Sequence, residues 1–481
     1  MALTSRRPAR LVLLAVAALA TACGKPFTTE GTGTSSTGPD ECRGALLACA
    51  GACVDPLTDP AHCGGCDRPC AGADVCSAGA CQPPGCPPGL GDCDGDLGTG
   101  CEVDLRVDPA HCGTCDNACF ATCAESACAT PVHLSAGAQY TCAVLSDGTL
   151  WCWGQNAWGN LGDGTMEDRL APTPVPLPSP ATSVGTGRDA GRTHTCAVLA
   201  SGAVACWGAG SNGQLGTGGT SDALSPLILD AFSGARRVAV GGAHACATTQ
   251  ARALLCWGQG ASGQIGNDST DDKPTPVPIL GNVADVAAGR AHTCALMTNG
   301  SVRCWGANQS GQLGIGSTQS AFEPTEIMNL SDVSHLALGA VHSCAVSTSG
   351  PVTCWGEGSF YRLGTGSSTD ERQPAPLDNL PDLAWIALGT RHSSAVTPAG
   401  DVLTWGDNTL GQLGDGTTVN AQIPIQIALT GVETTALGED HSCAITTAGE
   451  ILCWGANARG QLGDGTTDAH VTPAPVHWPK P

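Results

Sequence analysis

Apolar residues alternate with polar or small residues in short runs along most of the chain, and glycines interrupt these runs every few positions. In residues 283–306, Val286 lies in a run that ends at Gly289, and Cys294 lies in the run that follows. Alternation of this kind, rich in β-branched residues and bounded by glycine, is typical of strands rather than helices. The pattern therefore predicts an all-β fold for residues 131–481.

The strand pattern recurs seven times. With small variations, each copy contains an apolar stretch ending in glycine, then His-x-Cys-Ala, Cys-Trp-Gly, Gly-Gln-Leu-Gly and a proline-rich stretch. The tryptophan of the Trp-Gly step recurs at intervals of 48 to 54 residues, at Trp153, Trp207, Trp257, Trp305, Trp355, Trp405 and Trp454. A nearly fixed period of this length indicates a repeat array or a propeller, in which each copy forms one structural unit.

Two cysteines ten residues apart recur in every copy but the sixth, where Ser394 and Thr404 replace them. In the first copy Gly148 lies between the two cysteines, in a Ser-Asp-Gly sequence that predicts a hairpin loop. A symmetric hairpin brings the cysteines opposite each other on adjacent strands, close enough for a disulfide, and their joint loss agrees with this pairing. The predicted bonds are Cys142–Cys152, Cys196–Cys206, Cys246–Cys256, Cys294–Cys304, Cys344–Cys354 and Cys443–Cys453.

The beginning of the chain has the pattern of an export signal. Three arginines precede an apolar run that is too short for a permanent membrane span. The run ends in Leu-Ala-Thr-Ala-Cys at residues 19–23, which resembles the lipobox of bacterial lipoproteins, although Ala20 departs from the usual leucine. The resemblance implies that residues 1–22 form a lipoprotein signal peptide and that Cys23 is lipidated. The alternatives are an ordinary cleaved signal peptide, in which Cys23 has no special role, and a twin-arginine signal.

The next part of the chain divides into a tether and two small modules. Residues 23–41, rich in Gly, Thr, Ser and Pro, predict a flexible tether. Sixteen cysteines follow in two sets of eight, which predict one cysteine-rich module at residues 42–81 and a second at residues 82–130. An even set of cysteines in a small exported unit indicates a disulfide framework, although the sequence does not select one pairing.

Two metal sites are alternatives within these modules. His62, Cys63 and Cys66 have a spacing suited to zinc. Asp92 and Asp96 belong to a run of alternating carboxylates that resembles the start of a calcium loop, but valine stands where the loop requires a bidentate glutamate. A disulfide framework and a solvated turn are the preferred interpretations, so we predict no metal and no cofactor.

The charge of the chain excludes one class of partner. The formal net charge is −22, and lysine and arginine together number 21. A chain this acidic has no electrostatic footprint for a phosphate backbone, so we predict no nucleic-acid partner. Together with the export signal, these features predict a monomeric protein of the cell envelope, whose lipid anchor at the outer membrane or cell surface is its only membrane contact.

The repeats resemble those of a known family. Gly-x-x-His, Trp-Gly and Gly-Gln-Leu-Gly, combined once in each of the seven copies, resemble the repeats of the regulator of chromosome condensation family, over about 345 of the 481 residues. The resemblance implies a seven-bladed β-propeller with four-stranded blades, an architecture that closes radially. The stretch at residues 472–476 resembles the one that precedes each copy. We therefore expect the last strand to complete the first blade.

The same resemblance implies protein binding on a propeller face. We expect a surface-anchored or secreted protein for recognition, adhesion, scaffolding or inhibition, without catalytic activity. The best-known member of the family is a guanine-nucleotide exchange factor for a nuclear GTPase, an activity that the export signal disfavours here. Because fold does not imply function, that activity and an exported polysaccharide-acting enzyme on a propeller scaffold are kept as alternatives. Chemical groups that recur in register argue against a reaction centre, which needs unlike groups at one place.

Partner-binding residues are expected where a copy departs from the repeat. The fifth copy has Phe360, Tyr361 and Arg362 in its Gly-Gln-Leu-Gly loop, and the first copy has Trp158 in the equivalent loop. Aromatic residues and arginine are the usual anchors of an interface, and equivalent loops of a propeller share a face. These four residues form the predicted partner site, and the alternative is that they fill gaps between blades.

A histidine recurs in register in six copies, and Tyr140 replaces it in the first. A ring of histidines would be able to bind metal or to sense pH. The preferred interpretation is that each histidine makes the same structural hydrogen bond within its own blade. The six residues are His194, His244, His292, His342, His392 and His441.

Overall fold

A computed structural model describes residues 127–479 except 190, 349–351 and 379, together with short segments between residues 46 and 124. The predicted signal peptide, Cys23 and the predicted tether lie outside the described residues. The chain divides into two compact units, residues 1–85 and 86–481. No helix in the described part is long and apolar enough to cross a membrane.

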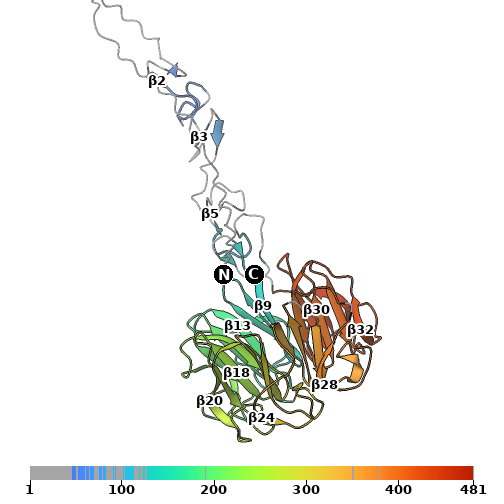
Figure 1. Cartoon of the computed structure of the whole chain (residues 1–481). Coiled ribbons are helices and arrows are strands. Elements are labelled where there is room, and N and C mark those ends of the chain that lie inside the picture. The colour runs from blue at the N-terminus through green and yellow to red at the C-terminus, as the bar shows by residue number, and fades with distance from the viewer. Residues whose placement is uncertain are drawn as a thin grey trace, which may run out of the picture. The chain divides into compact units, whose positions relative to one another are not determined.

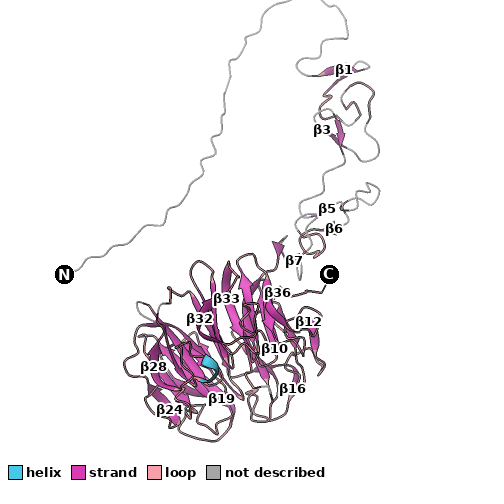
Figure 2. Ribbon diagram, turned by 90° about the vertical axis from the view of Figure 1, so that its right-hand side faces the viewer, coloured by secondary structure: helices cyan, strands magenta, loops and turns pink. Residues whose placement is uncertain are grey.

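Seven four-stranded antiparallel sheets follow one another between β9 (Pro131–Ala136) and β36 (His470–Pro475). They are arranged around a central axis as the blades of a propeller (Figure 1). Apart from the single 3-10 turn η1 (Ser359–Tyr361), the described elements are strands (Figure 2). The all-β, seven-bladed fold that the sequence predicts is therefore confirmed.

The strands of each blade are counted from the axis outwards. The first strands are β9, β13 (Ala181–Thr186), β17 (Ala235–Val240), β21 (Val283–Ala288), β25 (Val333–Leu338), β29 (Trp385–Leu388) and β33 (Val432–Leu437). The second strands are β10 (Tyr140–Leu145), β14 (His194–Leu199), β18 (His244–Thr249), β22 (His292–Met297), β26 (His342–Ser347), β30 (His392–Val396) and β34 (His441–Thr446). The third strands are β11 (Leu150–Gly154), β15 (Val204–Gly208), β19 (Leu254–Gly258), β23 (Val302–Gly306), β27 (Val352–Gly356), β31 (Val402–Gly406) and β35 (Ile451–Gly455). The fourth strands are β12 (Arg169–Pro174), β16 (Ala223–Leu229), β20 (Lys273–Leu280), β24 (Ala321–Glu326), β28 (Glu371–Pro376), β32 (Ala421–Gln426) and β36.

The ring closes without an exchanged strand, so the expectation that the last strand completes the first blade is wrong. β36 pairs with β35 of its own copy, with Pro475 opposite Leu452, and β9 is the innermost strand of the first blade. The last copy keeps its own proline-rich strand, so no blade lacks one. Contacts of β9 with β33 close the ring, and a hydrogen bond of 2.9 Å between Thr141 Oγ1 and His441 Nε2 joins the seventh blade to the first.

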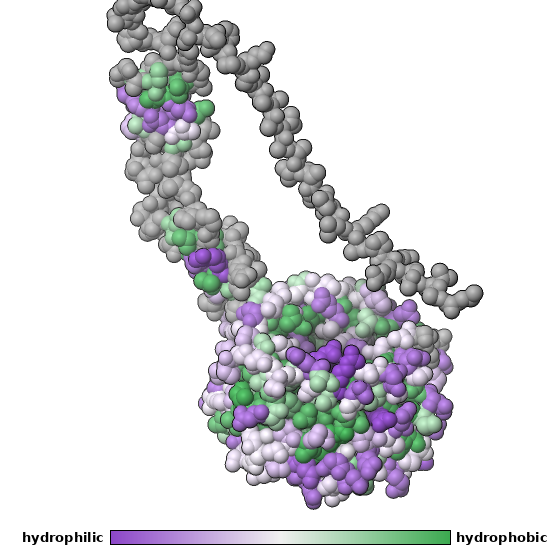
Figure 3. Space-filling model, turned by 60° about the vertical axis from the view of Figure 1, so that its left-hand side comes forward, coloured by the Kyte–Doolittle hydropathy of each residue, from purple (hydrophilic) through white to green (hydrophobic). Residues whose placement is uncertain are grey.

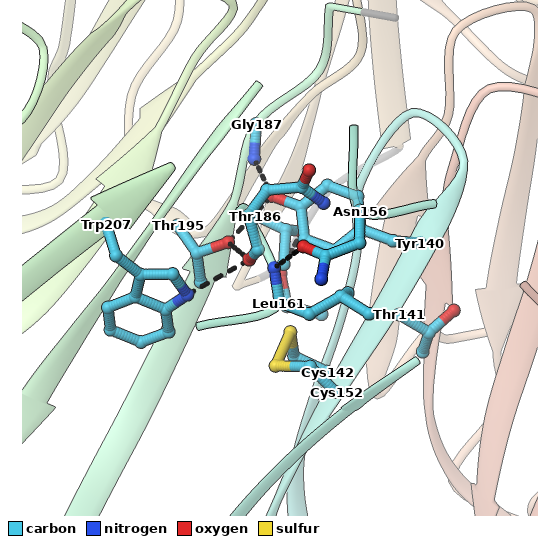
Figure 4. The surroundings of a disulfide bond; sticks show 12 residues. Tyr140, Thr141, Cys142, Cys152, Asn156, Leu161, Thr186, Gly187, Thr195 and Trp207 are labelled. Carbon is cyan, nitrogen blue, oxygen red and sulfur yellow. Dashed lines mark hydrogen bonds between the residues drawn. A yellow bond between two sulfur atoms is a disulfide. The ribbon is translucent and has the colours of Figure 1, made fainter. Parts of the chain in front are cut away.

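Hairpins between the second and third strands set the register of each blade. In the first blade Gly148 has a φ of 79°, a left-handed conformation that suits glycine, and Cys142 lies opposite Cys152. The two Cα atoms are 4.1 Å apart, and a disulfide joins the side chains (Figure 4). The other five predicted pairs are also bonded: Cys196–Cys206, Cys246–Cys256, Cys294–Cys304, Cys344–Cys354 and Cys443–Cys453.

The sixth blade replaces its disulfide with two hydrogen bonds. Ser394 lies opposite Thr404 in the same register that the cysteine pairs occupy elsewhere. The Ser394 hydroxyl is 2.7 Å from the Thr435 hydroxyl of the seventh blade. The Thr404 hydroxyl donates to the Leu413 carbonyl at 3.1 Å. Both side chains are buried, so these bonds satisfy polar groups that would otherwise cost stability.

Before the propeller, the described residues form short two-stranded ladders. They are β1 (Leu47–Cys49) with β2 (Ala52–Val54), β3 (Val75–Ser77) with β4 (Ala80–Gln82), β5 (Leu90–Gly91) with β6 (Val103–Asp104), and β7 (Cys123–Ala124) with β8 (Ala127–Cys128). Disulfides in this part include Cys49–Cys66, Cys63–Cys76, Cys112–Cys123 and Cys119–Cys128. Because Cys63 and Cys66 are bonded to other cysteines, neither offers the thiolate that the zinc alternative requires. Asp92 and Asp96 lie outside the described residues.

Candidate functional site

The connections of an antiparallel blade alternate between its two ends. The loops from first to second strand and from third to fourth strand therefore lie at one end of every blade, which we call the loop face. The Gly-x-x-His segments form the first set of loops and the Gly-Gln-Leu-Gly segments form the second set. Because Trp158, Phe360, Tyr361 and Arg362 belong to the second set, the fold places all four on the loop face.

The second set of loops joins each blade to the next. The indole N–H of Trp207 donates to the carbonyl of Asn160 in the preceding blade at 3.0 Å (Figure 4). A Cβ atom on Gly162, which ends the Gly-Asn-Leu-Gly segment of the same loop, would lie 2.5 Å from this indole nitrogen. The repeated segment therefore has a structural role, because its final glycine admits the tryptophan of the next blade. The same bond recurs in the other six blades.

Phe360 is the exposed aromatic residue of the fifth blade. Its side chain is 40% exposed, and it has a φ of 61°, followed by Tyr361 with a φ of 63°. In the other six copies a glycine with a φ between 71° and 81° stands at the position of Tyr361: Gly159, Gly213, Gly263, Gly311, Gly411 and Gly460. Two consecutive non-glycine residues in this conformation store backbone strain, which tends to concentrate at functional sites.

Arg362 is not an exposed anchor, and the expectation that it is one was wrong. Its side chain is only 3% exposed, because its guanidinium turns inward beneath the loop. Nε donates to the Ser359 carbonyl at 2.9 Å, and Nη1 donates to Glu357 at 3.0 Å and to the Thr390 carbonyl at 3.1 Å. Burial lowers the pKa of Arg362, while the charge of Glu357 opposes this effect. Arg362 thus fixes the turn that presents Phe360.

Two arginines that the sequence did not single out complete the surroundings of these aromatic residues. Arg391 lies 5.4 Å from the centre of the Phe360 ring, and its guanidinium also bonds to Asp440 at 2.6 Å. Arg192 lies 4.3 Å above the centre of the Trp158 ring. Cation–π contacts of this kind hold aromatic side chains in place. Among the described residues, the loop face therefore carries two aromatic–arginine groups in different blades.

The histidines are structural, but their partners lie in the next blade and not in their own. His244 Nε2 is 2.8 Å from the Thr293 hydroxyl, which itself donates to the Gln264 carbonyl at 2.9 Å. The hydroxyl proton is thus committed, and the histidine donates from Nε2–H. Burial lowers the pKa of His244 to about 4, so the ring is neutral at neutral pH. The equivalent bonds are His292–Ser343, His342–Ser393, His392–Ser442 and His441–Thr141.

A further group of residues, missed from the sequence, lies around the axis. In the first blade, His133 of the first strand pairs with Val144 of the second strand. One residue of each other first strand occupies the same register position. It lies four residues before the glycine of Gly-x-x-His. These residues differ in every blade except the first and fifth, and they share one level of the channel. They are His133, Ser183, Arg237, Asp285, His335, Trp385 and Thr434. The signal was present as one strand position whose residue changes from copy to copy.

Comparison with known families gives a consistent picture. The family model described as RCC1-like domain matches residues 88–436, and the model for the regulator of chromosome condensation (RCC1) repeat matches residues 432–461 and 448–480. A third model, for the Stigma-specific STIG1-like protein family, matches residues 28–83.

Individual relatives match one part of the chain. The ultraviolet-B receptor UVR8 of Arabidopsis thaliana is 38% identical over 100 residues, which are 21% of this chain and 22% of the receptor. The regulator of chromosome condensation of Xenopus laevis is 35% identical over 96 residues, 20% of this chain and 22% of the relative. The human E3 ubiquitin-protein ligase HERC2 is 35% identical over 99 residues, 21% of this chain and 2% of the ligase. The match thus spans less than a quarter of each of these relatives.

Solved structures share the fold. Human WBSCR16 superimposes with a TM-score of 0.61 at 23% identity, over 68% of this chain and 94% of that one. Prp20p of Saccharomyces cerevisiae, described with its binding properties to Gsp1p and histones, superimposes with a TM-score of 0.61 at 21% identity, over 71% and 86%. At these identities the likeness concerns the fold alone.

Proposed function

The chain belongs to the RCC1-like domain family, and from this membership we propose that it is a non-catalytic, protein-binding propeller that is exported and anchored at the cell surface. Its loop face would dock a protein partner, in a role of recognition, adhesion, scaffolding or inhibition. Family relatives support the class of partner, because Prp20p is described as binding the protein Gsp1p and histones. The lipobox-like sequence at residues 19–23 supports the proposed anchor.

The observation that carries the proposal is the strained turn at Phe360 and Tyr361. A left-handed residue costs on the order of 1–3 kcal/mol, and burial does not recover this cost at Phe360, which is 40% exposed. Arg362 beneath the turn and Arg391 beside it hold the ring in one orientation. A rigid, exposed aromatic residue flanked by arginine is a typical anchor for a protein partner, because little entropy is lost on binding.

Among the described residues, two other exposed large apolar groups, Leu410 and Val419, lie in the third-to-fourth-strand loop of the sixth blade, next to the blade that carries Phe360. Leu410 is 44% exposed and occupies the loop of the next blade that is equivalent to the turn at Phe360. On the side of the propeller seen in Figure 3, hydrophobic and hydrophilic residues are mixed. With Phe360, these residues form a small group of apolar anchors, as in many non-obligate interfaces.

The alternatives receive no comparable support. The similarity to HERC2 covers 2% of that ligase, so its ligase activity does not extend to this chain. An exchange-factor role would place the protein with an intracellular GTPase, which conflicts with the proposed export.

Site-specific cross-linking tests the proposal. A photoreactive p-benzoylphenylalanine replaces Phe360 in one protein and Met328 in the control, because Met328 is 76% exposed in a connection at the opposite end of its blade. We expect residue 360, and not residue 328, to cross-link to one protein from the cell envelope. The affinity of that protein is then measured for the wild type, for the consensus variant F360S/Y361G and for M328S. Equal affinities for all three proteins would refute the loop face as the docking site.

A further inference from the structure

The inner strands of the propeller line a channel whose shape follows from the alternation of their side chains. Successive residues of a strand point to opposite sides, so alternate positions of each first strand share the channel. The residues two positions before the glycine of Gly-x-x-His are all small: Ser135, Gly185, Ala239, Ala287, Ala337, Ala387 and Ala436. These small residues leave a cavity of about 180 Å³. Since a water molecule occupies about 30 Å³ in the liquid, the space accepts one small organic molecule.

Unlike polar groups meet at one level of this cavity. His133, Arg237, Asp285, His335 and Trp385 come from five blades, share one register position and line the cavity. They lie in the first half of their strands, toward the end opposite the loop face. This is the only level where the described first strands bring opposite charges together from neighbouring blades. The repeated scaffold thus holds a set of groups that does not repeat.

Only two of these groups carry charge at neutral pH. Arg237 Nη1 donates to Asp285 Oδ2 at 2.7 Å, and the two side chains are 40% and 27% exposed. Burial, reinforced by the charge of Arg237, lowers the pKa of His133 to about 4. Burial also lowers the pKa of His335. The level therefore presents one cation beside one anion, flanked by neutral imidazoles.

Groups around the pair provide further contacts for a ligand. Nδ1 of His133 is buried without a hydrogen-bond partner among the described residues, and a buried polar atom of this kind calls for a partner. Trp385 donates its indole N–H to the Thr435 carbonyl at 2.9 Å and meets the edge of His335 at 4.6 Å between ring centres. The indole is thereby fixed as an apolar wall of the cavity.

From this arrangement we propose that the axial cavity binds a small zwitterion of the amino-acid class. The ligand carboxylate pairs with the Arg237 guanidinium, which offers donors in a planar fork, and the ligand ammonium pairs with Asp285. A simple cation would meet the charges of Arg237 and of Arg188, which also lines the cavity. A simple anion would meet the charge of Asp285 beside Arg237, so each half-ligand should bind more weakly than the zwitterion. The apolar part of the ligand packs on Trp385.

The other end of the cavity is crossed by a side chain from the extended loop of the second blade. Arg188 Nη1 donates to the Leu388 carbonyl of the sixth blade at 2.7 Å. Burial lowers the pKa of Arg188 to about 10, so it stays charged at neutral pH. Because this guanidinium spans the channel on the loop-face side, the zwitterion site faces the end where the first strands begin. The site is therefore separate from the proposed docking surface at Phe360.

Isothermal titration calorimetry of the disulfide-bonded full chain tests the proposal with glycine, L-alanine and L-phenylalanine as probes, and with acetate and methylamine as half-ligands. We expect saturable binding of one amino acid per chain and weaker binding of either half-ligand. R237Q and D285N should each weaken binding about tenfold or more, because each removes one charge-assisted contact. R303Q is the matched control, since Arg303 pairs with Glu326 on outer strands and binding should be unchanged.

A second variant guards against loss of folding. A287L fills the space beside the charge pair and leaves both charges in place, so it should abolish binding while the unfolding transition remains that of a folded propeller. Absence of saturable amino-acid binding to the wild type would overturn the proposal. So would binding of acetate as tight as that of the amino acid, or binding that R237Q, D285N and A287L leave intact. In those cases Arg237 and Asp285 only join the third blade to the fourth.

Discussion

The carbonyl oxygen of Gln461 in the last blade accepts the indole N–H of Trp153 in the first blade at 3.0 Å. The same bond joins Gln312 to Trp355 between the fourth and fifth blades, also at 3.0 Å. The ring is thus closed by the contact that joins its interior blades, although no strand is exchanged between its ends.

W153F should therefore destabilise the protein as much as W355F does. Each variant removes one buried hydrogen bond and part of an indole, with an expected cost of about 2 kcal/mol. Denaturant unfolding under non-reducing conditions measures both. A much larger loss for W153F would show that the closing contact is special, and a negligible loss would show that the ring is closed elsewhere.

A seventh disulfide should form in the sixth blade. Ser394 and Thr404 occupy the register of the cysteine pairs, so S394C/T404C is expected to bond and to restrict the unfolded chain by about 2–3 kcal/mol. The variant also loses the hydrogen bonds to Thr435 and Leu413. Each lost bond offsets about 1 kcal/mol of the stabilisation by the disulfide. We expect a net gain of up to about 1 kcal/mol over wild type. Intact mass, which falls by two hydrogens, reports the bond, and S394A/T404A shows the cost of losing the hydrogen bonds alone.

His194 is the one histidine of the repeat without a hydrogen-bonded ring among the described residues, because Ala245 stands where the other blades have serine or threonine. A245S should add a hydroxyl that accepts from Nε2 of His194 and donates to the Gln214 carbonyl. The expected gain is about 1 kcal/mol. A247S, which adds a hydroxyl at another fully buried alanine, should destabilise the protein. Similar losses for both variants would contradict the role assigned to this position.

The buried histidines should make the protein sensitive to acid. Burial holds the pKa of His194 at about 3, against an ordinary value of 6.5. Below pH 6.5 the unfolded chain takes up protons that the folded chain excludes, so the contribution to stability is complete above that pH and falls as the pH decreases. Each such histidine contributes a slope of up to about 1.4 kcal/mol per pH unit. H194Q should reduce the slope of the unfolding free energy against pH, between about pH 6 and pH 5, by the contribution of one histidine. An unchanged slope would contradict this account.

How much the sequence predicts depends on how far apart the interacting residues lie. The Cys142–Cys152 pairing was predictable because Gly148 sets the register inside one hairpin. The partner of His244 was not, because Thr293 belongs to the next copy and the pattern within one copy does not show how blades pack.

The same limit applies to the candidate sites. Phe360 was identified from its departure from the repeat, whereas the inward turn of Arg362 depends on the Thr390 carbonyl of the following blade. Arg237 and Asp285 left a signal, since both are charged and occupy a strand position whose residue changes from copy to copy. That signal becomes readable only when the copies are aligned and the propeller axis is known.

Tyr361 provides a test that separates packing from function. It occupies the position of a glycine in the other copies and has a φ of 63°, which costs an L-residue roughly 1–2 kcal/mol. Y361G should therefore stabilise the protein by up to about 1 kcal/mol, since the greater freedom of glycine in the unfolded chain offsets part of the gain. The same change should weaken the binding of the partner protein that cross-links at residue 360, because Phe360 loses its fixed orientation. If Tyr361 served packing, its replacement would lower the stability of the protein. A Y361G protein that is less stable than the wild type would therefore show that the strained turn does not support the docking site.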